Sequence, residues 1–179
     1  MTMYNICLAD PYGHEMRWAD LCAAVRALFM QVVPGHATYD DVAGRHAPAR
    51  VEPGRYELLC YVVPSSMETL VGPQFRTSAS GAGITGWSTG EAVTGSEVYA
   101  NMASGLEQLA DLIFHEFLHN KLRMTDQQLH NHASGGLARS PIVPPMTPGN
   151  ASLMRGVLGQ LRPQWLGVWA SANEPMRGL

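Results

Sequence analysis

The sequence predicts a single α+β domain spanning residues 1–179, with a small twisted mixed sheet, one helix packed on it and a second helix that carries histidine and glutamate. Three observations support this fold class. The chain has 179 residues, of which 46% are hydrophobic, so it can bury a core of its own. Residues 55–64 have the β-branched and aromatic composition of a buried strand. Residues 14–30 and 106–122 have apolar side chains at helical intervals, and we find no internal repeat and no second domain.

The first helix is predicted at residues 14–30 and is expected to cover one face of the sheet. It should end near Pro34-Gly35, because proline and glycine terminate helices. His14-Glu15 has the first two letters of a metal-binding pattern, but position 18 is tryptophan, so no second ligand follows. These two residues are predicted to form the solvent-facing start of the helix. Its apolar positions are Trp18, Leu21, Cys22, Val25, Leu28 and Phe29.

Three strands are predicted between the two helices. Residues 55–64 end in a proline and are expected at the centre of the sheet. Residues 82–90 are rich in glycine, serine and threonine, a composition typical of an edge strand with a bulge beside a cleft, although a simple linker has it too. Residues 96–101 predict a short strand that turns into the second helix, with Ser104 as its N-cap and Glu107 completing a capping box.

The second helix, residues 106–122, contains a complete His-Glu-x-x-His motif at positions 115–119, a pattern in which two imidazoles bind zinc and a carboxylate serves as base. At about 100° per residue, one apolar stripe lies within about 60° of Leu106, whereas His115 and His119 fall about 180° and 220° away. One face is therefore expected to pack and the other to hold a metal. The stripe comprises Leu106, Leu109, Ala110, Ile113 and Phe117.

Glu116 lies between the two histidines in sequence but is turned from them by about 60–100° on the helix. This offset suits a carboxylate that contacts a metal-bound water instead of the metal. Zinc lowers the pKa of such a water to about 7, and a carboxylate within hydrogen-bond reach can take its proton as the water attacks a carbonyl. Glu116 is the predicted catalytic base. The motif also occurs by chance in helices that bind no metal, but the opposed apolar stripe favours a metal site.

A third zinc ligand is expected after His119, because catalytic zinc sites usually have three protein ligands and an open position. No cysteine follows the motif, and Glu174 is disfavoured because it lies near the C-terminus, where chains tend to fray. Asp126 precedes a short helical pattern and is expected at its N-cap or in its first turn. His130 is preferred, followed by His132 and then Asp126, because a Gly-Gly turn after these histidines can fold the chain back under the site. The histidine that does not bind metal could hydrogen-bond a substrate oxyanion.

At the motif the chain resembles the zincin superfamily of zinc metallopeptidases, and the resemblance covers residues 96–136. The metzincin pattern would place glycine at Leu122 and histidine at Thr125, and the gluzincin pattern would supply a glutamate from a following helix, so this chain departs from both. The nearest likeness is to small bacterial zincins with a later Leu-His and Gly-Gly-Leu segment, some of which are secretion-system toxins. The residues that carry this likeness are Leu129-His130 and Gly135-Gly136-Leu137.

The resemblance implies a zincin-like fold and a zinc-dependent endopeptidase in which Zn2+ is held by His115, His119 and His130. It also implies that a peptide or protein substrate pairs with an edge strand within residues 82–90. By analogy, the protein is an effector protease whose partners are a secretion machinery and an inhibitor or immunity protein. The alternative is a non-catalytic binding domain stabilised by zinc, which the absence of downstream cysteines disfavours, since closed structural sites prefer four Cys or His ligands.

The C-terminal part is expected to contain a loop stiffened by prolines and then two closing helices, at residues 153–161 and 165–172, split by Arg162-Pro163. Met146 lies in this loop. A position beneath the metal, as in metzincins, is one interpretation, but packing in the core is preferred.

The composition of the chain indicates which classes of partner and which compartment to expect. A net charge of −3 with 15% charged residues gives no electrostatic case for nucleic acid. The three cysteines Cys7, Cys22 and Cys60 have no metal-like spacing and are expected to be buried thiols. No apolar run approaches the length of a membrane span, and the N-terminus lacks the pattern of a signal peptide. Synthesis in the cytoplasm is expected, and export would either use a route that needs no such signal or follow the removal of a signal.

Overall fold

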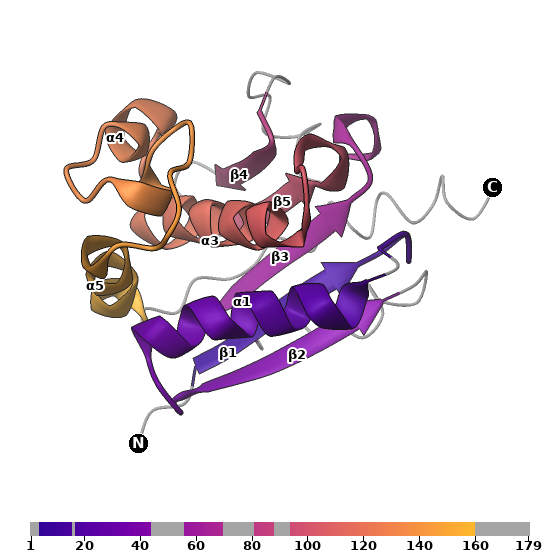
Figure 1. Cartoon of the computed structure of the whole chain (residues 1–179), viewed down its shortest axis with the longest axis horizontal. Coiled ribbons are helices and arrows are strands. Elements are labelled where there is room, and N and C mark those ends of the chain that lie inside the picture. The colour runs from indigo at the N-terminus through magenta and orange to yellow at the C-terminus, as the bar shows by residue number, and fades with distance from the viewer. Residues whose placement is uncertain (1–3, 16, 44–55, 70–80, 88–93, 160–179) are drawn as a thin grey trace.

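Figure 1 shows the computed structural model of the chain, which describes residues 4–15, 17–43, 56–69, 81–87 and 94–159 and has a mixed α+β fold. The strands are β1 (Tyr4–Asp10), β2 (Ala37–Ala43), β3 (Leu58–Val63), β4 (Gly83–Trp87) and β5 (Thr94–Tyr99). The helices are α1 (Trp18–Val32), α3 (Leu106–Leu122), α4 (Asp126–His130) and α5 (Pro148–Val157), with short 3-10 turns η1 (Ser66–Glu68), η2 (Ala100–Met102) and η3 (Gly136–Ala138).

The strands form one five-stranded sheet in the order β2-β1-β3-β5-β4. The first four strands in this order run parallel to one another, whereas β4, at the edge, runs antiparallel to β5. The central position predicted for residues 55–64 is confirmed by β3. All six of its side chains are buried, which explains its unbroken apolar sequence, because a parallel strand is covered on both faces.

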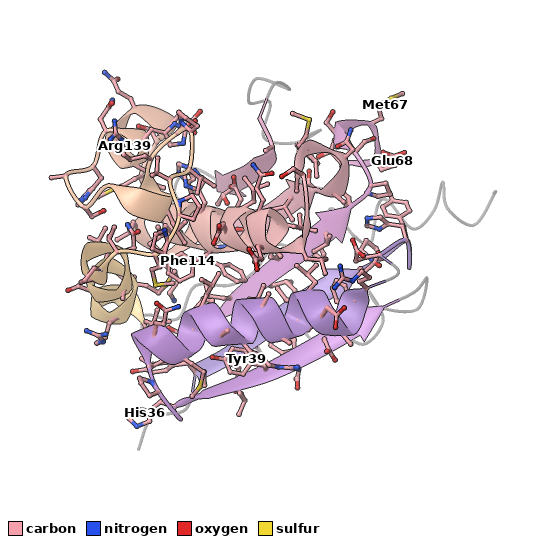
Figure 2. The ribbon with its side chains drawn as sticks, viewed as in Figure 1. His36, Tyr39, Met67, Glu68, Phe114 and Arg139 are labelled. Carbon is pink, nitrogen blue, oxygen red and sulfur yellow. The ribbon has the colours of Figure 1, made fainter. Side chains whose placement is uncertain are left out.

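The helices α1 and α3 lie side by side on one face of the sheet (Figure 1). Their contact is aromatic: the ring of Phe29 lies 5.4 Å from that of Phe114 and 5.7 Å from that of Phe117, measured between centroids. Figure 2 shows Phe114 in the layer between the two helices. Phe117 belongs to the stripe predicted for residues 106–122, and Leu109, Ala110 and Ile113 of the same stripe are also buried, so these positions pack as expected.

The start of the first helix was predicted wrongly. α1 begins at Trp18, and His14 lies before it, where its Nδ1 is 2.9 Å from Oδ1 of Asp10. The Asp10 carboxylate also accepts hydrogen bonds from the backbone N–H groups of His14 and Glu15. The buried carboxylate of Asp10, at the end of β1, therefore holds His14 and Glu15 in a turn, and α1 begins after this turn.

The N-terminus of α3 also differs from its prediction. Its N-cap is Gly105 and no side chain caps it, so the capping box expected from Ser104 and Glu107 is wrong. The backbone N–H of Ser104 instead donates to Oε1 of Gln108, at 2.6 Å. The helix ends at Leu122, and its C-cap Arg123 has a left-handed backbone (φ 53°) that reverses the chain towards α4.

The last described helix starts earlier than predicted. α5 begins at Pro148, because the side chain of Thr147 caps it and proline suits the first helical position. The second closing helix, predicted at residues 165–172, lies outside the described residues. Met146 is buried in the hydrophobic core, as preferred from the sequence, and the three cysteines are free and buried. None of the described helices combines the length and the apolar character needed to cross a membrane.

Candidate metal centre

The polar side of α3 is buried inside the protein. The side chains of His115, Glu116 and His119 are only 4–5% exposed. The elements that surround this side come from three parts of the chain: β4, α4 and the segment of η3. Enclosed polar side chains must find partners, because an unsatisfied buried group costs about 1–3 kcal/mol.

The third histidine, His130, lies on the short helix α4. Thr125 caps α4 through a complete capping box with Gln128, so the helix begins where the sequence predicted and Asp126 lies in its first turn. Leu129 is fully buried and anchors α4 in the core. His130 is the last residue of α4, and its imidazole reaches the two histidines of α3.

The three imidazoles meet through their Nε2 atoms. Nε2 of His115 lies 3.2 Å from Nε2 of His119 and 3.1 Å from that of His130, and the latter two are 3.3 Å apart. In tetrahedral coordination with Zn–N bonds of about 2.0–2.1 Å, two ligand nitrogens are about 3.3–3.4 Å apart. The spacing of the three nitrogens therefore fits one metal ion. Within the described part of the chain, these three residues form the group that could hold one.

Backbone carbonyls set the protonation of two of these rings. Nδ1 of His115 lies 2.6 Å from the carbonyl oxygen of Leu137, and Nδ1 of His119 lies 2.8 Å from that of Met124. A carbonyl can only accept, so each Nδ1 must carry the proton and each Nε2 presents a lone pair. Converging lone pairs repel one another unless a cation lies between them, and this carbonyl-to-histidine arrangement is the usual support of a metal ligand.

Burial also keeps these histidines uncharged. It lowers the pKa of His115 to about 4, against an ordinary value of 6.5, while the bond to Leu137 opposes the shift and the neighbouring imidazoles add to it. Burial lowers the pKa of His119 for the same reason. Both rings are therefore neutral near pH 7, which is the form that binds metal.

The other two predicted ligands do not join this group. Oδ1 of Asp126 is 3.9 Å from Nε2 of His119, but its side chain is 77% exposed. His132 lies in the turn after α4, where its Nδ1 accepts the backbone N–H of Ser134. Of the three alternatives for the third position, the structure brings His130 to the two histidines of the motif.

Asn150, which was not among the predicted site residues, fixes the backbone segment that contacts His115. Asn150 of α5 is fully buried; its Oδ1 accepts the N–H of Leu137, at 2.8 Å, and its amide donates to the carbonyl of Gly135, at 2.9 Å. These bonds hold the carbonyl that orients His115. A Cβ atom on Gly136 (φ 56°) would lie 2.5 Å from Oδ1 of Asn150, so glycine is required there. The pattern Thr-x-x-Asn at 147–150 indicates a helix cap but not this contact.

The carboxylate of Glu116 is held against the edge strand. The hydroxyl of Thr85 lies 2.7 Å from Oε2 of Glu116 and 2.9 Å from its carbonyl oxygen. Burial raises the pKa of Glu116 to about 8, although the bond from Thr85 lowers it; the charges of Asp126 and Glu97 raise it further. A cation beside a carboxylate has the opposite effect, so a metal at the histidines would favour the ionised form.

Comparisons of the chain with protein-family models, with curated proteins and with solved structures found no match. The case for a site therefore rests on the geometry of the three histidines and Glu116.

Proposed function

We propose that this protein is a zinc-dependent endopeptidase of the zincin type, with His115, His119 and His130 as metal ligands and Glu116 as base. The observation that carries the proposal is the convergence of three imidazole nitrogens at tetrahedral spacing, two of them from a helix that also carries a buried carboxylate. Three neutral nitrogen ligands are typical of catalytic zinc and leave one coordination position for water or substrate. A closed structural site would need a fourth protein ligand.

Zinc bound there would supply a Lewis acid that activates water and polarises the carbonyl of a peptide bond. The chain's own part is proton transfer and orientation. In its ionised form Glu116 accepts a proton from the attacking water at a carboxylate oxygen, and it then donates that proton to the nitrogen of the leaving amine. Its buried position restricts the carboxylate to a small set of orientations, which favours such a transfer.

The substrate is proposed to bind as an additional strand. β4 pairs with β5 on one side only, and among the strands that the structure describes no other pairs with it. An edge strand offers a row of N–H and carbonyl groups that an extended peptide can pair with. Thr85 contacts Glu116 from this same strand, so a peptide paired with β4 would lie close to the base.

The likeness to small bacterial zincins supports a role as an exported effector protease, which a dedicated inhibitor would restrain in the producing cell. This part of the proposal rests on the resemblance at Leu129-His130 and Gly135-Gly136-Leu137 alone.

The test combines metal analysis with hydrolysis. The purified protein is dialysed against metal-free buffer, its zinc is measured per chain, and a library of quenched fluorescent peptides is used to detect cleavage. We expect about one zinc per chain and peptide hydrolysis. Glu116→Gln should keep the zinc and lose about 10²- to 10⁴-fold in kcat. A chain that takes up no zinc contradicts the metal site, and a Glu116→Gln variant with full activity contradicts the assigned base.

A further inference from the structure

The face of β4 that meets α3 is shaped around the carboxylate of Glu116. Gly83 and Thr85 are two residues apart on β4, so they lie on the same face of the strand. Both contact the same side chain: Thr85 through its hydroxyl, and Gly83 through the space that its missing side chain leaves. The edge strand therefore touches the carboxylate at two points.

Gly83 leaves the room that the carboxylate needs. A Cβ atom at this position would lie 2.8 Å from Oε1 and 2.9 Å from Cγ of Glu116, and 2.9 Å from the carbonyl oxygen of Glu97. One of these atoms belongs to the backbone of β5 and cannot move without disturbing the strand pairing. Any larger residue at position 83 would therefore displace the carboxylate.

The hydroxyl of Thr85 is itself oriented by a chain of hydrogen bonds. Its oxygen lies 3.0 Å from Oγ of Ser96, and that oxygen accepts a hydrogen bond of 3.0 Å from the side-chain amide of Asn120. An amide NH₂ can only donate, so Ser96 accepts from Asn120 and has its own proton available for Thr85. Thr85 is then left with one proton for Glu116, whose Oε2 is the nearer acceptor at 2.7 Å and whose carbonyl oxygen lies at 2.9 Å.

The resulting order, Asn120 to Ser96 to Thr85 to Glu116, begins and ends on α3 and passes through β5 and β4. Ser96 and Asn120 are fully buried, and hydrogen bonds in such a chain strengthen one another in a medium of low dielectric constant.

We propose that Thr85 is a positioning residue for the base: its hydroxyl, directed by Ser96 and Asn120, holds the Glu116 carboxylate, and Gly83 provides the space in which it lies. This inference rests on the proposed function and adds the element that aligns its base. Since the substrate is proposed to pair with the outer edge of β4, the same strand would set the position of both the base and the peptide.

The experiment compares three variants at one position. Thr85→Val keeps the shape and removes the hydroxyl, Thr85→Ala removes both without overpacking, and Thr85→Ser restores the hydroxyl. Zinc content, melting temperature, kcat and KM are measured for each on the peptide cleaved best by the parent. Thr38→Ala is the matched control, because Thr38 is an exposed threonine on β2, at the other edge of the sheet.

We expect Thr85→Val and Thr85→Ala to lose about tenfold to 100-fold in kcat with zinc and KM nearly unchanged, since small displacements of a catalytic group can cost this much. Thr85→Ser should recover most of the rate, and Thr38→Ala should match the parent. If the valine variant does not fold, the alanine and serine variants decide the question. Parental kcat in Thr85→Ala overturns the proposal, and so does an equal loss in Thr85→Ser and Thr85→Ala that follows their melting temperatures.

The parent and Glu116→Gln are assayed beside these variants, which separates the two proposals. A zinc-loaded parent that cleaves no peptide overturns the proposed function, and the role of Thr85 with it. An active parent, an inactive Glu116→Gln and a fully active Thr85→Ala overturn the role of Thr85 alone.

Discussion

Helix α3 buries two groups of polar side chains, and they are satisfied in different ways. Near its C-terminus the ammonium of Lys121 lies 3.0 Å from Oε1 of Glu57, and both side chains are almost inaccessible. There, opposite charges neutralise each other, and the backbone N–H of Gly159 also donates to the same carboxylate. In the histidine group, two of the three Nε2 atoms that face one another can only accept.

The difference shows how to tell a structural polar cluster from a binding site. The pair of Lys121 and Glu57 contains both signs of charge, so it is complete within the chain and needs no ligand. The histidine group brings lone pairs together without a positive charge to balance them, and a bound metal cation would supply that charge.

His130→Ala should abolish zinc retention, because it removes one of three ligands, and should leave the stability of the metal-free chain within about 1 kcal/mol of the parent. The measurements are zinc per chain after dialysis and chemical unfolding in chelator. His132→Ala is the matched control and should retain zinc. Equal, partial losses in the two variants would contradict the assignment of His130 as third ligand.

Lys121→Met should have the opposite profile. Removing the cation beside the buried Glu57 carboxylate is expected to destabilise the chain by about 3–5 kcal/mol. The folded fraction should still bind zinc with parental stoichiometry. In the double variant Lys121→Met with Glu57→Leu, the buried charge is gone and most of the stability should return. A zinc stoichiometry that falls in the folded protein would show that the two groups are coupled.

The pH dependence of the metal-free chain should report Glu116. Its pKa is raised from 4.5 to about 8, so between these values the folded chain keeps a proton that the unfolded chain has released. This group therefore contributes full stability below pH 4.5, and the contribution falls as pH rises, by up to about 1.4 kcal/mol per pH unit. Glu116→Gln cannot lose a proton, so its stability relative to the parent should increase with pH through this window.

Unfolding by urea at several pH values in chelator measures that difference. The contributions of His115 and His119 are common to both proteins and cancel. A difference that stays constant from pH 5 to pH 8 would contradict a carboxyl group kept neutral by burial.

Asp126→Asn should have the smallest effect. The carboxylate is 77% exposed and lies 3.9 Å from His119, so solvent screens most of its field. Zinc content should stay at the parental value, and zinc affinity, measured by competition with a chromophoric chelator, should change by less than about tenfold. A complete loss of zinc would instead make Asp126 a ligand.

Much of the fold follows from local patterns. The central strand and the two long helices, including the motif helix with its packed stripe, were predictable because hydrophobic periodicity depends on residues a few positions apart. The edge strand at residues 82–90 was predictable as an element, and β4 confirms it at Gly83–Trp87. The helix α3 begins at Leu106 as predicted, but its cap was not predictable, because the backbone N–H of Ser104 donates to Gln108. The start of α1 at Trp18 was not predictable either, because Asp10 accepts the backbone N–H groups of His14 and Glu15.

The candidate site was likewise predictable from the sequence only in part. The placement of His115, Glu116 and His119 on the polar side of a helix could be read from the sequence, because the α-helix has a fixed period. Which of His130, His132 and Asp126 lies against the two histidines of the motif depends on the tertiary fold, since the left-handed turn at Arg123 and the anchoring of Leu129 set the direction in which α4 points. The tertiary fold alone brought Thr85 to Glu116 and Asn150 to Leu137. These contacts join residues 31 and 13 positions apart, and such pairings are fixed by strand order and packing rather than by any local pattern.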